Sequence, residues 1–247
     1  MSAALVLDQV TKRFGGLTAV NGVSLRVESG ERRVMIGPNG AGKTSLFHCI
    51  SGVLQSTSGR IECLGHDITH MPENQRTWLG MGRTFQISSV FADLTVLENI
   101  ALARLGIQAS KWSMWRSALN SSELRQLAAD HLEQVGLPGR ESWQVKSMSY
   151  GEKRQLELVL ALVNQPRLLL LDEPCAGLSP AERQRLASII RELPRSITML
   201  MIEHDMDVAL ALADRVSVLH HGQLIVEGDA STVQRDPKVR EVYFGQL

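Results

Sequence analysis

The sequence predicts an α/β domain with a parallel core sheet, an antiparallel β region at its N-terminus and an inserted helical subdomain. Two nearly unbroken apolar runs, residues 168–171 and 197–202, are typical of strands buried on both faces of a parallel sheet. Short runs rich in Val and Leu between residues 4 and 27 indicate antiparallel strands. Residues 88–163 carry longer helical stretches and are expected to form the subdomain within one domain that spans residues 1–247.

Glycines mark where these elements begin and end. Gly15-Gly16 and Asn21-Gly22 are expected to be turns between the N-terminal strands. Ser29-Gly30 turns the chain into a short strand, residues 32–36. In the helical region, residues 121–135 predict a helix that stops at Gly136.

Composition and charge limit the classes of function. With 247 residues and 44% hydrophobic content, the chain is long enough for one large α/β domain with a real core. Lys plus Arg and Asp plus Glu both number 26, so the formal net charge is +0 and no overall field favours nucleic acid. We therefore expect no nucleic-acid partner.

The cysteines and the apolar runs indicate where the chain works. Cys49, Cys63 and Cys175 show no metal-ligand spacing, and their odd number argues against a disulfide scaffold, so we expect a reducing cytosol. The N-terminus lacks the pattern of a secretion signal, and no apolar run approaches the roughly 20 residues that span a bilayer. If the protein acts at a membrane, we expect another chain to cross it.

The strongest motif, residues 37–44, follows the predicted strand 32–36 and matches G-x-x-x-x-G-K-[ST]. Such glycines let the backbone wrap closely, so that its N–H groups and the N-terminus of the next helix face phosphates. We expect Lys43 to reach the β- and γ-phosphates of ATP and the Thr44 hydroxyl to bind Mg²⁺. The expected nucleotide-binding residues are Gly37, Pro38, Asn39, Gly40, Ala41, Gly42, Lys43, Thr44 and Ser45. The alternative is a plain glycine turn before a helix that ends at Gly52.

An acidic pair, Asp172 and Glu173, ends the apolar run 168–171. A carboxylate at the end of a buried strand can hold Mg²⁺, usually through water, while its neighbour polarises the attacking water. We expect Asp172 to be the metal ligand and Glu173 the catalytic base. The alternative is a helix cap, with Pro174 as the first helical residue.

A third motif, residues 148–155, precedes apolar residues at helical spacing. Ser149 and Glu152 predict a capping box, so alone this segment is an ordinary helix start. Together with the previous two motifs, however, it resembles the L-S-G-G-Q signature of ATP-binding cassette (ABC) proteins. Met148, Tyr150 and Glu152 depart from that pattern. Ser149 and Gly151, which lie nearest to phosphate in the family, are retained.

The resemblance extends along nearly the whole chain and implies roles for further residues. Phe14 corresponds to an aromatic residue that stacks on adenine, although alone it would suggest a core residue. Gln86 matches a glutamine that touches Mg²⁺ or water. His204 matches a histidine that senses the γ-phosphate, although a lone His there would suggest a structural residue. Ser179 replaces the usual Asp of the loop 175–179.

The C-terminal part continues the likeness: residues 216–227 are similar to the family's last hairpin, with His221-Gly222 at its turn. The family fold further implies a head-to-tail dimer with an identical or paralogous ABC ATPase subunit. Ser149 and Gly151 of one subunit would then cover the γ-phosphate held by the other. We therefore expect the isolated chain to bind ATP and to hydrolyse it to ADP and phosphate slowly.

Several segments resemble one branch of the family, the ATP-binding subunits of bacterial importers for branched-chain amino acids, amides or urea. They are GRTFQ, VFADLTVLENI, the Tyr-Gly signature, EPCAGLSP, MIEHDM and the ending Val242-Tyr243-Phe244-Gly245. This branch implies transmembrane permease subunits and, indirectly, a periplasmic binding protein as partners. It also implies a cytoplasmic chain that is peripheral on the inner face of the membrane. The transported compound would be selected by those other subunits.

Two alternatives remain at the level of sequence. An ABC ATPase of lipopolysaccharide export, or of a soluble iron–sulfur assembly system, has similar length and motifs, whereas a nucleotide switch without turnover is disfavoured by Glu173 and His204.

A docking groove for a permease helix could be lined by Trp112, Trp115 and Met114. The alternative is that these three residues simply belong to the core.

Overall fold

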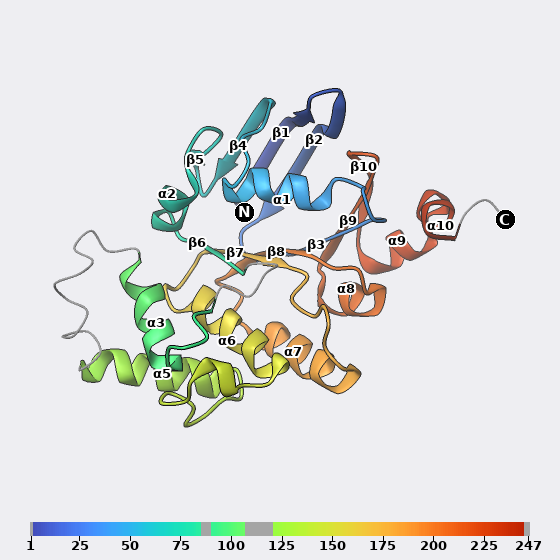
Figure 1. Cartoon of the computed structure of the whole chain (residues 1–247). Helices are drawn as coiled ribbons and strands as arrows, with labels where there is room; N and C mark the ends of the chain where they lie inside the picture. Colours follow the sequence, from blue (N-terminus) through green and yellow to red (C-terminus); the bar gives the residue numbers. More distant parts are fainter. Residues whose placement is uncertain (1, 85–89, 107–120, 245–247) are drawn as a thin grey trace. The chain divides into compact units, whose positions relative to one another are not determined.

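The computed structural model describes residues 2–84, 90–106 and 121–244, and divides into two compact units. The first comprises Met1–Met81, Arg167–Glu173 and Pro194–Leu247, and the second comprises Gly82–Pro166 and Pro174–Leu193. Within the described residues, we find no helix with the length and apolar character needed to cross a membrane. The strands of Figure 1 are β1 (Ala3–Phe14), β2 (Leu17–Glu28), β3 (Arg32–Ile36), β4 (Ser58–Cys63), β5 (His66–Asp67), β6 (Met81–Arg83), β7 (Leu168–Asp172), β8 (Thr198–Ile202), β9 (Arg215–His220) and β10 (Gln223–Gly228). The helices of the first unit are α1 (Lys43–Ser51), α2 (Glu73–Trp78), α8 (Met206–Leu212), α9 (Ala230–Arg235) and α10 (Pro237–Phe244).

The N-terminal strands form a four-stranded sheet in the order β2-β1-β4-β5. The predicted turn at Gly15-Gly16 is confirmed, since Phe14 pairs with Leu17 across it. The predicted turn at Asn21-Gly22 is wrong, because these two residues lie inside β2 opposite the single residue Thr11. Gly22 adopts a φ of 64° and donates its N–H to the Thr11 hydroxyl at 3.0 Å. The Asn-Gly pair therefore forms a β-bulge that the partner strand stabilises.

The second sheet has the order β10-β9-β3-β8-β7-β6. The predicted strands at 32–36 and 168–171 are confirmed as β3 and β7, and the run 197–202 forms β8. Strands β9, β3, β8 and β7 pair in parallel, which confirms the predicted parallel core sheet. Every residue of β3, β7 and β8 is buried, which is typical of strands covered on both faces of a parallel sheet, and in β3 this includes Arg32 and Arg33.

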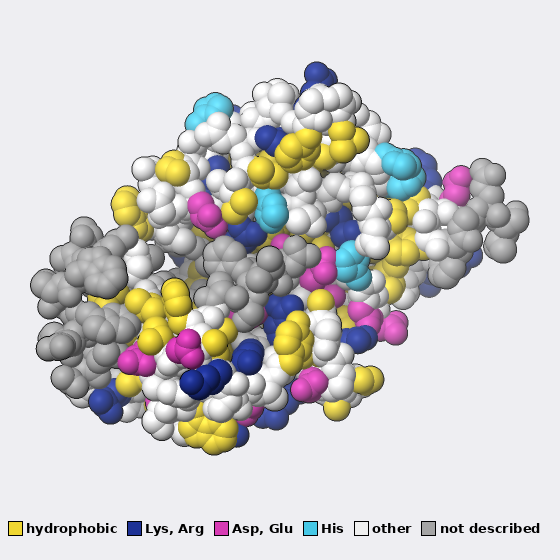
Figure 2. Space-filling view, in the orientation of Figure 1, with side chains coloured by type: hydrophobic (Ala, Val, Ile, Leu, Met, Phe, Trp, Pro, Cys, Tyr) yellow, Lys and Arg dark blue, Asp and Glu magenta, His cyan; other side chains and the backbone are white. Residues whose placement is uncertain are grey.

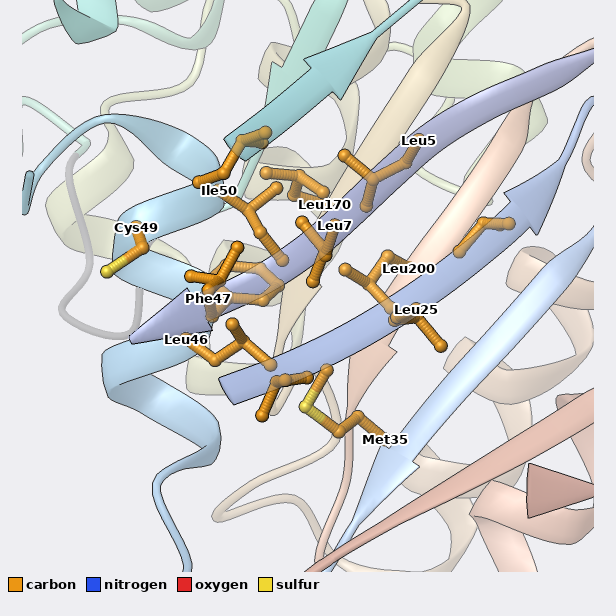
Figure 3. Close-up of a cluster of buried hydrophobic side chains, with 14 of the residues drawn as sticks. Leu5, Leu7, Leu25, Met35, Leu46, Phe47, Cys49, Ile50, Leu170 and Leu200 are labelled. Carbon is orange, nitrogen blue, oxygen red and sulfur yellow. The ribbon is translucent and has the colours of Figure 1, made fainter. Parts of the chain in front are cut away.

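Helix α1 lies between the two sheets of the first unit (Figure 1). Figure 3 shows Leu46, Phe47 and Ile50 of α1 among side chains of β1, β2, β7 and β8. These three α1 side chains are fully buried, each contributing about 2 kcal/mol to stability. The helix ends before Gly52, as predicted, and the buried Arg76 guanidinium donates to the last carbonyl groups, Cys49 O and Ile50 O, at 2.8 and 2.7 Å. The helix that follows the glycine loop is thus fixed along its side and at its end.

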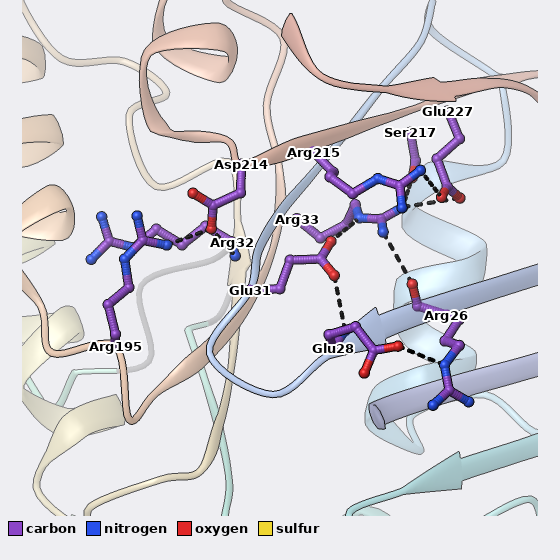
Figure 4. A network of polar contacts seen from close by, with 10 residues as sticks. All are labelled: Arg26, Glu28, Glu31, Arg32, Arg33, Arg195, Asp214, Arg215, Ser217 and Glu227. Carbon is purple, nitrogen blue, oxygen red and sulfur yellow. Dashed lines mark hydrogen bonds and ion pairs between the residues drawn. The ribbon is translucent and has the colours of Figure 1, made fainter. Parts of the chain in front are cut away.

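A buried arginine joins the strands beneath the C-terminal hairpin (Figure 4). Arg33 of β3 is fully buried and pairs with Glu31 at 2.6 Å and with Glu227 of β10 at 3.0 Å. Its guanidinium also donates to the Ser217 hydroxyl at 2.9 Å and to the Arg26 carbonyl at 3.0 Å. The acceptors of the Arg33 guanidinium thus lie on β2, β9, β10 and the turn before β3. A buried charge requires such partners.

The second unit is helical, with α3 (Val96–Leu105), α5 (Ser122–Gln134), α6 (Tyr150–Leu162), α7 (Pro180–Glu192) and a short 3₁₀ turn, Val145–Ser147. The predicted helix 121–135 is confirmed as α5, whose N-cap is Ser121, and Gly136 follows it with a φ of 75°. The predicted capping box is also confirmed, because the Ser149 hydroxyl accepts from the Glu152 N–H while the Glu152 carboxylate accepts from the Ser149 N–H. The boundaries 88–163 of the subdomain stay a prediction.

Candidate functional site

The carboxyl ends of three parallel strands lie side by side in the first unit. Met35 of β3 and Asp172 of β7 both pair with Ile202 of β8. The segments that leave these strands are the loop 37–44, which we call the phosphate loop, the residue Glu173, and the pair Glu203-His204. Ligands of open α/β sheets bind beyond this edge of the strands, so the topology brings the predicted chemical groups of the first unit together.

The phosphate loop wraps tightly against neighbouring backbone. A Cβ atom at Gly37 would lie 2.2 Å from the Leu219 carbonyl oxygen, and one at Gly42 would lie 2.3 Å from the Ala19 carbonyl oxygen. Gly42 also adopts a φ of 99°, immediately before α1. Glycine is therefore required at both positions, by close approach at Gly37 and by approach and conformation at Gly42.

The turn of the C-terminal hairpin forms a hydrogen bond with the phosphate loop. The hairpin is confirmed, with His221 and Gly222 between β9 and β10. The Gly222 N–H donates to the Ala41 carbonyl at 2.9 Å, and the Gly222 carbonyl accepts from the Asn21 N–H at 2.8 Å. Sequence reasoning identified the hairpin turn and the phosphate loop but missed these contacts, because they join segments far apart in the chain.

Lys43 is buried at the base of the phosphate loop. Its ammonium donates to the carbonyl groups of Gly37 at 2.6 Å and of Pro38 at 3.0 Å. Burial lowers the pKa of Lys43, while the negative charges of Glu173 and Asp172 oppose that shift. The lysine therefore lies within electrostatic reach of both carboxylates, and its ammonium is held where the loop curls around it.

The start of α1 points its first N–H groups toward the same region. Gly42 precedes the helix without a side-chain cap, and its carbonyl accepts the Leu46 N–H at 2.9 Å. The N–H groups of Lys43, Thr44 and Ser45 come before that first bond and so have no partner within the helix. A helix end of this kind favours an anion such as a phosphate group.

The Thr44 hydroxyl and the Asp172 carboxylate are oxygen donors of the kind that Mg²⁺ prefers. Asp172 ends β7 with only 1% of its surface exposed, and its charge acts on Lys43, the residue beside Thr44. The part of the chain that the structure describes holds no group of three or more His, Cys, Asp or Glu that could hold a metal alone. Mg²⁺ is usually held by one or two protein oxygens together with water and substrate phosphates, so this donor set fits that ion.

Glu173 follows β7 in an unusual backbone conformation. Its φ is 49°, which side-chain-bearing residues rarely adopt, and its N–H donates to the Ile202 carbonyl at 3.0 Å. Its carboxylate Oε1 lies 2.5 Å from Nε2 of His204. The helix-cap alternative is wrong, because Pro174 lies in a turn and the next helix begins at Pro180. Strained residues held in place by their surroundings are often found at functional sites.

Phe14 lies at the end of β1 and is 45% exposed, so it is not a core residue. The ammonium of Lys12 lies 5.0 Å from the centre of its ring. Figure 2 shows hydrophobic side chains at the surface in the region of the N-terminal hairpin, where Leu17 is exposed as well. An exposed aromatic face of this kind can stack on a planar base.

The second unit carries the remaining candidates that the structure describes. Ser149 is the N-cap of α6, and Gly151 lies in its first turn, where a Cβ atom would approach Glu182 Oε1 to 2.5 Å. Their backbone N–H groups thus lie at a helix N-terminus, which suits phosphate. The other predicted residues, Gln86, Trp112, Met114 and Trp115, lie outside the described residues.

Tyr243 lies beside the phosphate loop, a placement that sequence reasoning missed. Burial raises the pKa of this tyrosine, and a hydrogen bond with the backbone of Gly37 opposes the shift. The C-terminal helix α10 therefore reaches the first residue of the phosphate loop. The sequence alone gives no sign of this contact, because Tyr243 and Gly37 lie far apart in the chain.

Comparisons with a family model and with known proteins agree with one another. A family model described as ABC transporter matches residues 20–176. The chain is 36% identical over 98% of both chains to the high-affinity branched-chain amino acid transport ATP-binding protein LivG of Salmonella typhimurium. It is 35% identical, again over 98% of both chains, to the corresponding protein BraF of Pseudomonas aeruginosa.

Solved structures agree over the full length. An ATP-binding cassette of an ABC transporter in its ADP conformation matches with a TM-score of 0.86 and 32% identity, covering 100% of both chains. A nucleotide-free ATP-binding cassette from an ABC transporter matches with a TM-score of 0.86 and 31% identity, covering 99% of this chain and 100% of that one. The chain therefore resembles these two cassettes in amino-acid sequence as well as in fold.

Proposed function

Because the chain belongs to the ABC transporter family, as an ATP-binding and ATP-hydrolysing subunit, we propose that it powers the uptake of branched-chain amino acids or related amides or urea. The observation that carries the choice of substrate class is the near full-length likeness to two branched-chain amino acid transport proteins. It is joined by the sequence features of the same branch that extend from residue 82 to residue 245.

The phosphate loop and its neighbours would bind the nucleotide. Gly37, Pro38, Asn39, Gly40, Ala41, Gly42, Lys43, Thr44 and Ser45 would surround the phosphates, and Phe14 would stack on adenine. Support comes from the tight glycine backbone and from the buried Lys43 ammonium beside it. A triphosphate would take over the acceptor role that the Gly37 and Pro38 carbonyl groups now fill for Lys43.

Mg²⁺, when bound, would neutralise charge that develops on the phosphates. Thr44 and Asp172, with Gln86 as a third ligand, would hold it. The buried position of Asp172 at the end of β7 supports this assignment.

Glu173 would accept a proton from the attacking water, and His204 would orient the carboxylate and contact the γ-phosphate. Gln86 would help to position that water. The 2.5 Å contact between Glu173 and His204 supports a joint role, since a general base must itself be oriented. The products are ADP and phosphate.

A second ABC ATPase subunit would complete the site. Ser149 and Gly151 of that subunit would present the N-terminus of their helix to the γ-phosphate, adding N–H donors where negative charge concentrates. The capped, undistorted start of α6 supports this role. We further propose that residues 1–247 act as one nucleotide-binding domain with a helical subdomain at about 88–163.

Permease subunits in the membrane would be the immediate partners, with a periplasmic binding protein acting indirectly. The chain would then work on the cytoplasmic side, as a peripheral protein of the inner face of the membrane.

The test is uptake together with co-purification. Cells that lack the gene should lose uptake of radiolabelled leucine, isoleucine, valine or urea, and the parent gene should restore it while the Glu173→Gln variant should not. The tagged chain should co-purify from membranes with permease subunits. Unchanged uptake of all these compounds, or co-purification with lipopolysaccharide-export or soluble iron–sulfur assembly proteins, would contradict the proposal.

A further inference from the structure

Tyr150 makes a contact that the start of a helix does not require. It is the first residue of α6 and stands where the resembling family pattern has glycine. The capping box of Ser149 and Glu152 already fixes the helix start. Tyr150 is 49% exposed, yet its hydroxyl donates to the Ala176 carbonyl at 3.2 Å. This bond joins the start of α6 to residues 174–178, which we call the post-glutamate loop because they follow Glu173 directly.

The hydroxyl of Tyr150 is held in place from the other side. Arg154, one turn further along α6, donates to it from Nη2 at 2.8 Å and from Nε at 3.1 Å. Arg154 is itself fixed by a 3.0 Å pair with Glu157, and the side chains of both are less than a tenth exposed. The phenol oxygen thus accepts from a guanidinium and donates to a backbone carbonyl, which is a fully oriented arrangement.

The ring of Tyr150 also accounts for glycine at position 177. Gly177 adopts a φ of 75°, and a Cβ atom there would lie 3.1 Å from Cε1 and 3.2 Å from the hydroxyl of Tyr150. The post-glutamate loop therefore fits against the tyrosine by both conformation and close approach.

A second departure from the family pattern meets the same two segments. Ser179, where the family has Asp, caps α7 and binds the Glu182 carboxylate through its hydroxyl at 2.6 Å and its N–H at 3.0 Å. Glu182 held in this way lies against Gly151, where a Cβ atom would approach its Oε1 to 2.5 Å. Both unusual residues, Tyr150 and Ser179, thus build contacts between the start of α6 and the chain that follows Glu173.

We infer that Tyr150 is a positioning residue for ATP hydrolysis, which couples the phosphate-facing turn at Ser149 and Gly151 to the post-glutamate loop and hence to Glu173. The inference rests on the proposed function. The turn at Ser149 and Gly151 would contact a nucleotide held by the other subunit. The Tyr150–Ala176 hydrogen bond would then restrain the post-glutamate loop, whose first residue, Pro174, is joined to Glu173 by the peptide bond. Glu173 already adopts a rare backbone conformation, so small changes in the loop would alter its orientation.

The Tyr150→Phe variant tests this coupling, because it removes the hydroxyl and keeps the ring beside Gly177. We expect kcat per ATP-binding site to fall about three- to tenfold, with KM and the Kd for ATP changed less than about twofold. We also expect faster amide hydrogen exchange in residues 174–178. Ser147→Ala is the matched control, since it removes an exposed hydroxyl-to-carbonyl bond to Gln144 in the same unit, at 2.7 Å, and should leave kcat and exchange in that loop at the parent values.

The outcomes separate the two proposals. If the parent chain shows no ATP hydrolysis at any protein concentration, the proposed function is contradicted, and the coupling that rests on it is overturned with it. If the parent is active and Tyr150→Phe keeps the parent kcat, or changes only KM, the coupling is overturned. An equal loss of kcat in Ser147→Ala would also overturn it, because the effect would then belong to the unit as a whole.

Discussion

Nε2 of His204 and Oε1 of Glu173 lie 2.5 Å apart, although the two residues follow different strands of the parallel sheet. The contact is possible because β7 and β8 are neighbours, with Asp172 opposite Ile202 and the Glu173 N–H bonded to the Ile202 carbonyl. The contact with the histidine thus fixes the position of the carboxylate. It brings the proposed base, Glu173, together with the residue predicted to sense the γ-phosphate.

Glu173→Gln should abolish turnover and keep nucleotide binding. The substitution removes the proposed proton acceptor, for which a loss of roughly 10²- to 10⁴-fold in kcat is typical, while the phosphate loop is untouched. Phosphate release gives kcat, and binding of a fluorescent ATP analogue gives the affinity. Hydrolysis at the parent rate would show that another group serves as the base.

Lys43→Ala should weaken ATP binding by about 10- to 100-fold, because charge-assisted hydrogen bonds to phosphate contribute about 1.5–3 kcal/mol. Equilibrium dialysis measures the Kd directly. The variant also loses the bonds to the Gly37 and Pro38 carbonyl groups, so its free energy of unfolding is measured alongside. A folded variant with the parent Kd would argue against a phosphate role for this lysine.

Gly42→Ala should destabilise the chain more than Gly40→Ala does. Both residues adopt positive φ angles, 99° and 78°, which costs alanine about 1 kcal/mol. Only at Gly42 would the new Cβ atom collide with a backbone oxygen, at 2.3 Å, whereas nothing lies within 4 Å of it at Gly40. We expect about 1 kcal/mol for Gly40→Ala and about 3 kcal/mol for Gly42→Ala in urea unfolding. Equal losses would mean that the loop relaxes away from Ala19.

The sequence predicts those parts of the site that consist of consecutive residues. Residues 168–171 are apolar without interruption, because β7 is covered on both faces, and the acidic pair follows at the strand end. The phosphate loop is likewise one unbroken motif. Its position beside Asp172 follows from the order of the parallel strands, which the fold class predicts in outline.

The parts that the sequence does not predict depend on pairing between distant segments. Asn21-Gly22 has the composition of a hairpin turn, and only Thr11 on the opposite strand decides that it is a bulge. The contact of Gly222 with Ala41 has the same character, since both partners look like ordinary turn or loop residues. Phe14 shows the limit of such reasoning for a side chain, because an aromatic residue beside a Gly-Gly turn alone suggests the core, whereas Phe14 is 45% exposed.

Arg33→Met should lower the free energy of unfolding by about 3–5 kcal/mol, because it removes one partner of a buried charge network and leaves Glu31 and Glu227 without it. Arg60→Ala is the matched control. Its side chain is 60% exposed and pairs with Asp67 at 2.8 Å, so its loss should cost less than about 1 kcal/mol. Urea unfolding of both variants measures the difference, and a loss at Arg33 no larger than at Arg60 would mean that methionine repacks the site.

ATP hydrolysis by the purified chain should depend on protein concentration more steeply than linearly. The first unit supplies the phosphate loop, Asp172, Glu173 and His204, whereas Ser149 and Gly151 are proposed to act on nucleotide held by another subunit. Well below the dimer dissociation constant, doubling the chain should therefore raise the rate about fourfold by mass action. Mixing the Lys43→Ala and Ser149→Ala variants tests directly whether the site is shared between subunits. In a mixed dimer, one intact phosphate loop faces one intact turn at Ser149 and Gly151. Each variant alone should be nearly inactive, and the mixture should recover activity; a linear rate without recovery would mean that each chain hydrolyses ATP by itself.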